Sequence, residues 1–488
     1  MDIESKSKLY LPIVVIVFLV FLFQLTTLSA FRMNGDEAIY MLIMEELGKI
    51  TGGQWPSMNP IIHYSGPLNF WALGSVYALT SMLPQIEPAA WMVRLPPFLF
   101  FWIGTWFLFA EIRRWSLSSA MWFLFFAAIT PMTLVYSRVA FPHSFMLGLF
   151  SVCVAESMRI YRTGNVRLLL LFFLAGVSAD LHTTAVFGMA VVFMPVARII
   201  ARQSIRQPGR FIIGCTFFLV IAYPVIRNFP PPIEAGAEKG RSILMEVRNL
   251  LNIVSGYQPY IFWLHKDIAP NLLLAVFLCL TGYVMYREWW AVKRSSYSLD
   301  KFLKAFFLLH IVGTAVILFM CYSGRSLVLI GHERYFLSLV PGWVLIASDA
   351  FRRWSGKLGG VFLALLFVFY FSRLAIPVVG ASMENDPSLL AARWLVKHCP
   401  SRECVAVAEN FWNYWPIRYY TRDSIDLNYH GDNWKTARLH ALNGRETASC
   451  WYAYKGVKFV GTWKNKVDFI KQSGSDGETC FLGSVSKP

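Results

Sequence analysis

Residues 31–50 read FRMNGDEAIYMLIMEELGKI and open a long polar and aromatic loop that extends from Arg32 to Arg94. An apolar run precedes this loop and several more follow it, each close to the 20 residues that span a bilayer as a helix. In residues 36–50 the apolar side chains recur every three or four positions, which predicts an amphipathic helix lying in the plane of the membrane. The chain therefore reads as a membrane scaffold built around one external loop.

The composition supports a polytopic membrane protein. Of the 488 residues, 56% are hydrophobic and only 15% are charged, which excludes an ordinary soluble enzyme. The net charge of +16 comes mostly from Lys and Arg in short loops between apolar runs, where they set the topology. No nucleic-acid partner is expected.

The apolar runs predict about eleven transmembrane helices. The first run is longer than the core of a signal peptide, which favours an uncleaved span. A helix over 67–83 is predicted to lie flat in the interface, because all the main basic clusters then fall on the side of the N-terminus. The predicted spans are 9–30, 95–111, 117–136, 142–158, 168–183, 185–200, 211–227, 270–286, 302–321, 335–350 and 360–376.

This topology puts the N-terminus in the cytoplasm and two large loops, 31–93 and 228–269, on the external face of an inner (plasma) membrane. The second loop contains another predicted in-plane helix over 241–254. The expected fold is an all-α membrane domain over 1–376, followed by a small external, periplasmic α/β domain over 377–488.

The polar tail carries the signals of that α/β domain. Asp386-Pro387 predicts the start of a helix through Lys397, while ECVAVAEN (403–410), GVKFVGTW (456–463) and TCFLGSVS (479–486) predict strands. Four cysteines in the tail indicate two disulfides in an oxidising compartment, with a zinc site as the alternative, although no CxxC pair is present. They are Cys399, Cys404, Cys450 and Cys480.

Asp36 and Glu37 begin the first in-plane helix. One interpretation is structural: Asp36 is the N-cap and Glu37 a first-turn acid favoured by the helix dipole. The other is catalytic, because a carboxylate beside an apolar boundary is a better proton acceptor for a hydroxyl group. Both interpretations fit the spacing.

Several cations and histidines are predicted on the same external side. An arginine in apolar surroundings usually has an anionic partner, and its fork of donors suits phosphate. Alternatively, His143 and His182 could form a metal site together with Asp36 instead of contacting a substrate. The candidates for binding a substrate or its phosphate are Arg94, Arg138, Arg325, Arg334, His63, Tyr64, His143, His182, His332 and Tyr335.

The order of these motifs resembles the GT-C glycosyltransferases of the protein O-mannosyltransferase and lipid A aminoarabinose transferase type. The resemblance covers residues 9–376. It is carried by the early Asp-Glu pair, GPLNFW (66–71), VRLPP (93–97), TPMTLVYSRVAFPHS (130–144) and HERYFLSLVP (332–341).

Such enzymes transfer a sugar from a polyprenyl-phosphate donor to a glycan, lipid or protein acceptor on the external face, usually with inversion. By this resemblance Asp36 is the catalytic base, and Arg94, Arg138 and Arg334 bind the donor phosphate. The resemblance implies no certain cofactor and leaves a divalent metal open.

The sequence departs from the aminoarabinose transferases at three positions. Ser65-Gly66-Pro67 stands where they carry a Lys-Pro pair, and His143 and His182 stand where the family commonly has an acid and a lysine. These differences favour a general polyprenyl-phosphate sugar transferase over an aminoarabinose-specific one.

Two other classes fit parts of the sequence. A transporter or flippase of a lipid-linked or anionic substrate explains the number of spans, but it usually carries charged residues near the bilayer midplane. A non-catalytic receptor explains the tail, whose aromatic run FWNYWPIRYY (411–420) would then bind glycan.

Overall fold

The computed structural model divides into two compact units: Met1–Leu28 with Ile50–Pro377, and Ser29–Lys49 with Val378–Pro488. The residues it describes are 3–28, 37–38, 41–42, 90–140, 142–227, 298–323, 336–354, 389, 392–393, 396, 405–408, 411–421, 426–429, 447–454 and 457–464. We call the first unit the helical unit and the second the sheet unit.

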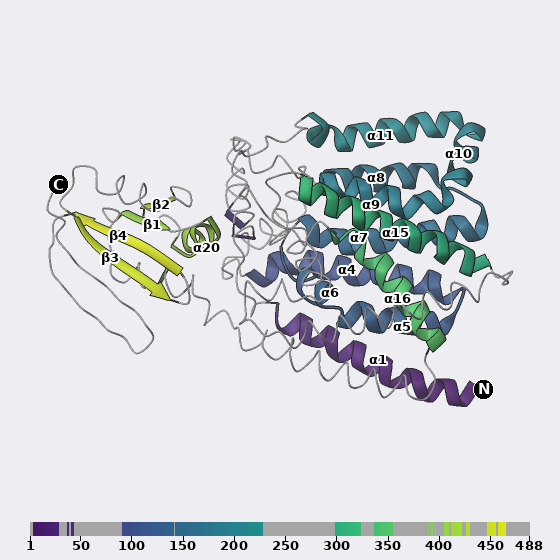
Figure 1. Ribbon diagram of the computed structural model, residues 1–488, viewed down its shortest axis with the longest axis horizontal. Coiled ribbons are helices and arrows are strands. Elements are labelled where there is room, and N and C mark those ends of the chain that lie inside the picture. Colours follow the sequence, from purple (N-terminus) through teal and green to yellow (C-terminus); the bar gives the residue numbers. More distant parts are fainter. Residues whose placement is uncertain are drawn as a thin grey trace, which may run out of the picture. The chain divides into compact units, whose positions relative to one another are not determined.

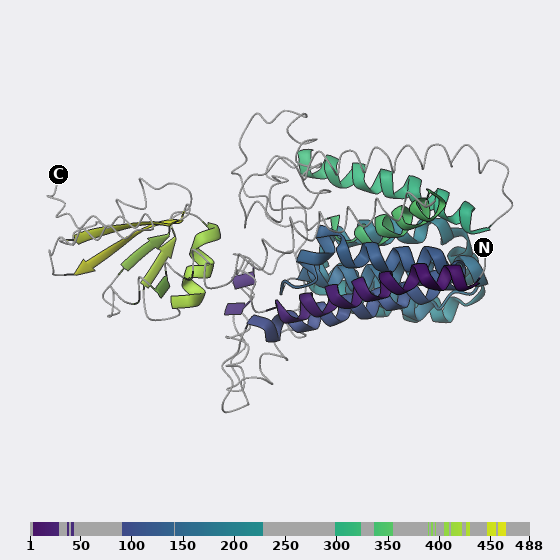
Figure 2. The ribbon, with the colours of Figure 1, turned by 90° about the horizontal axis from the view of Figure 1, so that it is seen from below.

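The described part of the helical unit is a bundle whose long helices lie side by side, so that their ends gather at two opposite faces (Figure 1). In Figure 2 α15 and α16 lie on one side of this bundle. The elements are α1 (Ile3–Thr26), α4 (Ala90–Arg113), α5 (Leu117–Ile129), α6 (Pro131–Tyr136), α7 (Pro142–Thr163), α8 (Leu168–Leu181), α9 (Thr183–Phe193), η3 (Met194–Val196), α10 (Ala197–Arg206), α11 (Pro208–Arg227), α15 (Ser298–Ser323) and α16 (Val340–Trp354).

Nine of the eleven predicted spans overlap these helices, and the other two, 270–286 and 360–376, lie outside the described residues. Among the described helices, three are long and apolar enough to cross a membrane, and four more are apolar but shorter. The predicted in-plane helices at 67–83 and 241–254 also lie outside the described residues. The count of eleven spans therefore stays a prediction.

The predicted continuous span over 117–136 is interrupted. Thr130 adopts an extended conformation between α5 and α6 (φ −61°, ψ 129°) because the ring of Pro131 disfavours a helical conformation in the preceding residue. The hydroxyl of Thr133 donates to the carbonyl of Ala127 at 2.6 Å across the break. The short α6 that follows leads directly to Arg138.

Two glycines allow α4 and α7 to approach each other closely. A Cβ atom added to Gly104 would lie 2.2 Å from the carbonyl oxygen of Gly148, and one added to Gly148 would lie 2.3 Å from that of Phe100. Only hydrogen fits at these two positions, so the backbones meet directly.

The sheet unit contains four described strands in the order β2-β1-β4-β3. They are β1 (Val405–Ala408), β2 (Asp426–Tyr429), β3 (Thr447–Tyr454) and β4 (Val457–Lys464), and α20 (Phe411–Thr421) connects β1 to its parallel neighbour β2. The other pairings are antiparallel. Two of the strands predicted from sequence coincide with β1 and β4, and the third, 479–486, lies outside the described residues.

The aromatic run at 411–420 forms α20, and part of it is buried. Tyr414, Ile417 and Tyr419 are shielded from solvent, and α20 contacts β1 and β2. These three side chains pack within the sheet unit, and glycan binding by the run stays a prediction. The cysteine pairing predicted for the tail lies outside what the structure describes, whereas Cys153 and Cys215 are free.

Candidate active site

Arg94 joins the ends of two helices. It lies near the start of α4, is completely buried, and donates from Nη1 to the carbonyl oxygen of Leu28 at 2.7 Å, just beyond the end of α1. Leu28 lies two residues past Thr26, the last residue of α1. The hydrogen bond from Arg94 therefore joins the start of α4 to the segment that leaves α1.

Arg138 reaches the same end of α1 from a different element. It follows α6 and is completely buried. Its Nε donates to the carbonyl oxygen of Leu134 at 2.8 Å, and its Nη1 donates to the hydroxyl of Thr27. The centroid of the Phe23 ring lies 5.6 Å from the guanidinium carbon, so the last turn of α1 and Thr27, the residue after it, both contact this cation.

Two guanidinium groups thus converge on consecutive residues, Thr27 and Leu28. A charge in such apolar surroundings is costly unless an anion or several acceptors stabilise it. Each guanidinium offers five N–H donors in a planar fork that matches a phosphate or a carboxylate. This part of the bundle is suited to hold an anionic group.

His143 and His182 form a second buried pair at the same face of the bundle. His143 lies in the first turn of α7, and His182 is the C-cap of α8. Their ring centroids are 4.4 Å apart, and both side chains are buried. Within the described residues no group of three His, Cys, Asp or Glu side chains is arranged to hold a metal ion, and Asp36, the third predicted ligand, is not among them.

Three buried polar side chains beside these residues were not predicted from the sequence. The hydroxyls of Ser137 and Ser144 lack a hydrogen-bond partner among the described residues. Gln24 accepts from Nε1 of Trp102 at 3.0 Å, and its amide nitrogen likewise has no described partner. The sequence did contain a signal for these three residues, because each is a polar residue that interrupts or ends an apolar run.

Glu37 belongs to the sheet unit, where it is only 1% exposed. Its companion Asp36 lies outside the described residues. The same is true of the predicted site residues His63, Tyr64, Arg325, His332, Arg334 and Tyr335.

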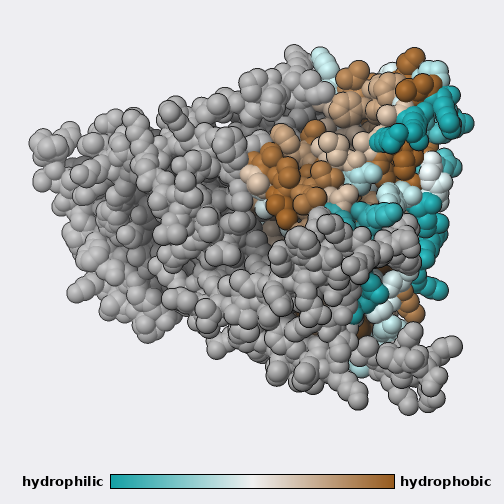
Figure 3. All heavy atoms as spheres, turned by 45° about the vertical axis from the view of Figure 1, so that its right-hand side comes forward, coloured by the Kyte–Doolittle hydropathy of each residue, from teal (hydrophilic) through white to brown (hydrophobic). Residues whose placement is uncertain are grey.

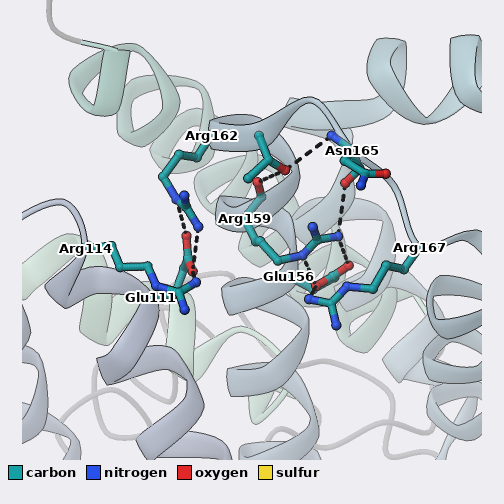
Figure 4. Close-up of polar contacts among 8 residues, drawn as sticks. Glu111, Arg114, Glu156, Arg159, Arg162, Asn165 and Arg167 are labelled. Carbon is teal, nitrogen blue, oxygen red and sulfur yellow. Dashed lines mark hydrogen bonds and ion pairs between the residues drawn. The ribbon is translucent and has the colours of Figure 1, made fainter.

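The opposite face of the helical unit carries two buried carboxylates that are paired with arginines (Figure 4). Glu111 accepts from Arg114 at 2.7 Å and from Arg162 at 2.8 Å, while Glu156 accepts from Arg159 at 2.6 and 2.7 Å. The pair of Glu111 with Arg162 ties the end of α4 to the end of α7, whereas Glu156 and Arg159 pair within α7. Glu156 is therefore part of an ion pair near a helix end and not an isolated charge in mid-span.

Comparisons with known proteins identify a shared fold. No family model and no curated protein matches the sequence. The crystal structure of ArnT from Cupriavidus metallidurans bound to undecaprenyl phosphate superposes with a TM-score of 0.56, covering 94% of this chain and 98% of that chain at 13% identity. The apo structure of the same protein gives a TM-score of 0.49 at 14% identity. The chain thus shares the fold of this ArnT, which the order of its motifs predicted.

Proposed function

We propose that this chain is a membrane glycosyltransferase that transfers a sugar from a polyprenyl-phosphate donor to an acceptor hydroxyl. The observation that carries the proposal is the convergence of Arg94 and Arg138 on the end of α1, in a fold shared with an ArnT that binds undecaprenyl phosphate. A polyprenyl phosphate offers an anion that matches the planar donor fork of the two guanidinium groups, and a tail that a membrane bundle accommodates.

The proposed reaction is a direct displacement. A carboxylate, Asp36, takes the proton of the acceptor hydroxyl while that oxygen bonds to the anomeric carbon of the sugar. The bond from this carbon to the phosphate oxygen breaks, and its electron pair leaves with the polyprenyl phosphate. Attack opposite the leaving group inverts the anomeric carbon.

Arg94 and Arg138 stabilise the charge that develops on the leaving phosphate. A preorganised donor of this kind contributes about 3 kcal/mol to transition-state stabilisation. Arg325 and Arg334 are proposed to extend the donor site. Glu37 is proposed as a catalytic carboxylate beside Asp36. The other candidates are proposed to bind the donor phosphate or the substrate: His63, Tyr64, His143, His182, His332 and Tyr335. The acceptor is a lipid, a glycan or a protein.

The site is proposed to face the periplasm, on the side to which the C-terminal residues are also assigned. In an alternative arrangement, Asp36, His143 and His182 hold a divalent metal instead of acting directly on the substrate. A chelator distinguishes the two arrangements, because it lowers the transfer rate only where a metal takes part.

The test uses the full chain, purified in detergent or reconstituted in vesicles, with polyprenyl-phosphate hexose and pentose donors. We expect release of free polyprenyl phosphate together with transfer of the sugar to an acceptor lipid or glycan. If no donor is cleaved but a lipid-linked sugar moves between leaflets, the protein is a flippase and the proposal is wrong.

A further inference from the structure

A cationic surface lies on α10 and the start of α11, at the face of the bundle opposite Arg94 and Arg138. Arg198, Arg202 and Arg206 recur every fourth residue, which aligns them along one side of α10, and Arg210 follows in the first turn of α11. All four are exposed. We call these four residues the α10 arginine surface.

Neither the neighbouring sequence nor the described residues supply an acidic partner for the α10 arginine surface. The sequence contains no Asp or Glu between Asp180 and Glu234. In the described part of the chain no ion pair involves these arginines, and the polar contact of Arg210 is with Gln207 at 3.2 Å. By contrast, Glu111 and Glu156 compensate Arg114, Arg159 and Arg162 at the same face.

Apolar side chains are exposed among these arginines. Ile205, between Arg202 and Arg206, is 80% exposed, and Met194 and Ile212 are exposed on either side of α10. None of the residues of α10 is buried. A short helix that exposes both arginines and large apolar side chains is typical of helices that lie at the boundary between headgroups and acyl chains.

The position of α10 fits this environment. Figure 1 shows it at the end of the bundle that also carries the N-terminus, between the apolar helices α9 and α11. The chain leaves the line of α9 at the 3-10 turn of Met194–Val196. In Figure 3 hydrophilic residues gather at this end of the helical unit, beside its hydrophobic flank.

We propose that the α10 arginine surface binds the phosphate headgroups of anionic phospholipids in the leaflet next to the N-terminus. Four exposed arginines supply the charge complementary to such headgroups, and Ile205 and its neighbours supply contact with the acyl chains. The lipid is the occupant because a soluble anion would leave these apolar side chains in water. This inference does not depend on the proposed enzymatic function.

The test compares lipid binding by the full chain in neutral detergent. Phosphatidylglycerol is added to the wild type and to the variant R198Q/R202Q/R206Q, and bound lipid is counted by native mass spectrometry while the Tm is measured. We expect a fall in affinity of about fivefold for each arginine removed, with phosphatidylcholine giving little binding to either protein. High salt should weaken the wild-type interaction.

Two controls distinguish charge at α10 from other effects. The variant R198K/R202K/R206K keeps the charge and should retain most of the binding, whereas R113Q removes an exposed arginine from α4 and should bind like the wild type. If the triple glutamine variant does not fold, the phosphatidylglycerol affinities of the single variants R202Q and R113Q are compared instead. R202Q should bind more weakly than R113Q.

Three results would overturn the inference. One is phosphatidylglycerol binding by the folded glutamine variants at wild-type strength. Another is equal binding of phosphatidylglycerol and phosphatidylcholine by the wild type. The third is a wild-type Tm shift that inorganic phosphate reproduces at the same phosphorus concentration, which would identify an anion site instead of a lipid surface.

Discussion

Arg138 donates a hydrogen bond to the hydroxyl of Thr27, although the two residues are 111 positions apart in the sequence. Thr27 in turn donates to the carbonyl oxygen of Phe23 at 2.6 Å, and Phe23 presents its ring to the same guanidinium. One turn of α1 therefore orients Arg138, which makes Thr27 a positioning residue for the proposed donor-phosphate site.

The first prediction concerns this contact. Thr27→Val keeps the shape of the side chain but removes the acceptor of Arg138, so kcat/KM for the polyprenyl-phosphate donor should fall about tenfold, mainly through KM. The variant Arg138→Lys also loses the planar fork of donors, so its kcat/KM for the same donor should fall about 10²-fold. Steady-state kinetics with a labelled donor measures both.

Thr26→Val is the matched control. The hydroxyl of Thr26 donates to carbonyls within α1, and the residue is exposed. Its kinetics should match those of the wild type. Equal donor KM values for the Thr26 and Thr27 variants would remove Thr27 from the positioning of Arg138.

The second prediction concerns the crossing of α4 and α7. Gly148→Ala places a methyl group about where the backbone of Phe100 lies, so the helices must separate at a cost of about 2 kcal/mol. The Tm in detergent should fall. The donor KM should rise as well, because α4 carries Arg94 and α7 carries His143.

Gly209→Ala controls for the loss of a glycine alone. A Cβ atom at Gly209 meets nothing within 4 Å, so this change should leave the Tm unchanged or raise it slightly. A Gly148→Ala protein as stable as Gly209→Ala would mean that the two helices do not meet through Gly104 and Gly148.

The third prediction concerns the ion pairs at the opposite face. Glu111 is buried and accepts from both Arg114 and Arg162, so Glu111→Gln leaves their charges without compensation and should destabilise the protein by about 3 kcal/mol. Arg114 is 58% exposed, and Arg114→Gln should cost less than about 1 kcal/mol. Thermal unfolding of the two variants in the same detergent tests the difference, and similar losses would contradict it.

The sequence predicted the helical elements well where the signal was local. Apolar runs of about 20 residues correspond to α4 and α7 within a few residues. The break before Pro131 was predictable from the proline itself, because proline disfavours a helical conformation in the preceding residue. Strands β1 and β4 followed from their β-branched and aromatic residues.

The contacts that build the candidate site were not local, and the sequence did not reveal them. Nothing in the residues around Arg138 points to Thr27 as its partner. The packing of α1 against α5, which precedes α6 and Arg138 in the chain, brings the two residues together. Likewise, the aromatic run of α20 suggested a binding strip because aromatic residues serve equally in packing and in recognition. The roles of Gly104 and Gly148 also depend on a tertiary contact.

The last prediction concerns the proposed base. Asp36→Asn should abolish sugar transfer while leaving expression, Tm and donor binding close to those of the wild type. Asparagine keeps the size and much of the N-capping ability of aspartate, so folding should be little affected. It accepts no proton, however, and the transfer rate should fall at least about 10²-fold.

Glu37→Gln is the matched comparison. Because Glu37 is buried, its loss should lower the stability of the protein while the rate of the chemical step falls less than in Asp36→Asn. The measurements are single-turnover transfer rate, equilibrium donor binding and thermal unfolding for both variants. Turnover by Asp36→Asn near the wild-type rate would exclude Asp36 as the base, and a selective loss of turnover in Glu37→Gln would transfer that role to Glu37.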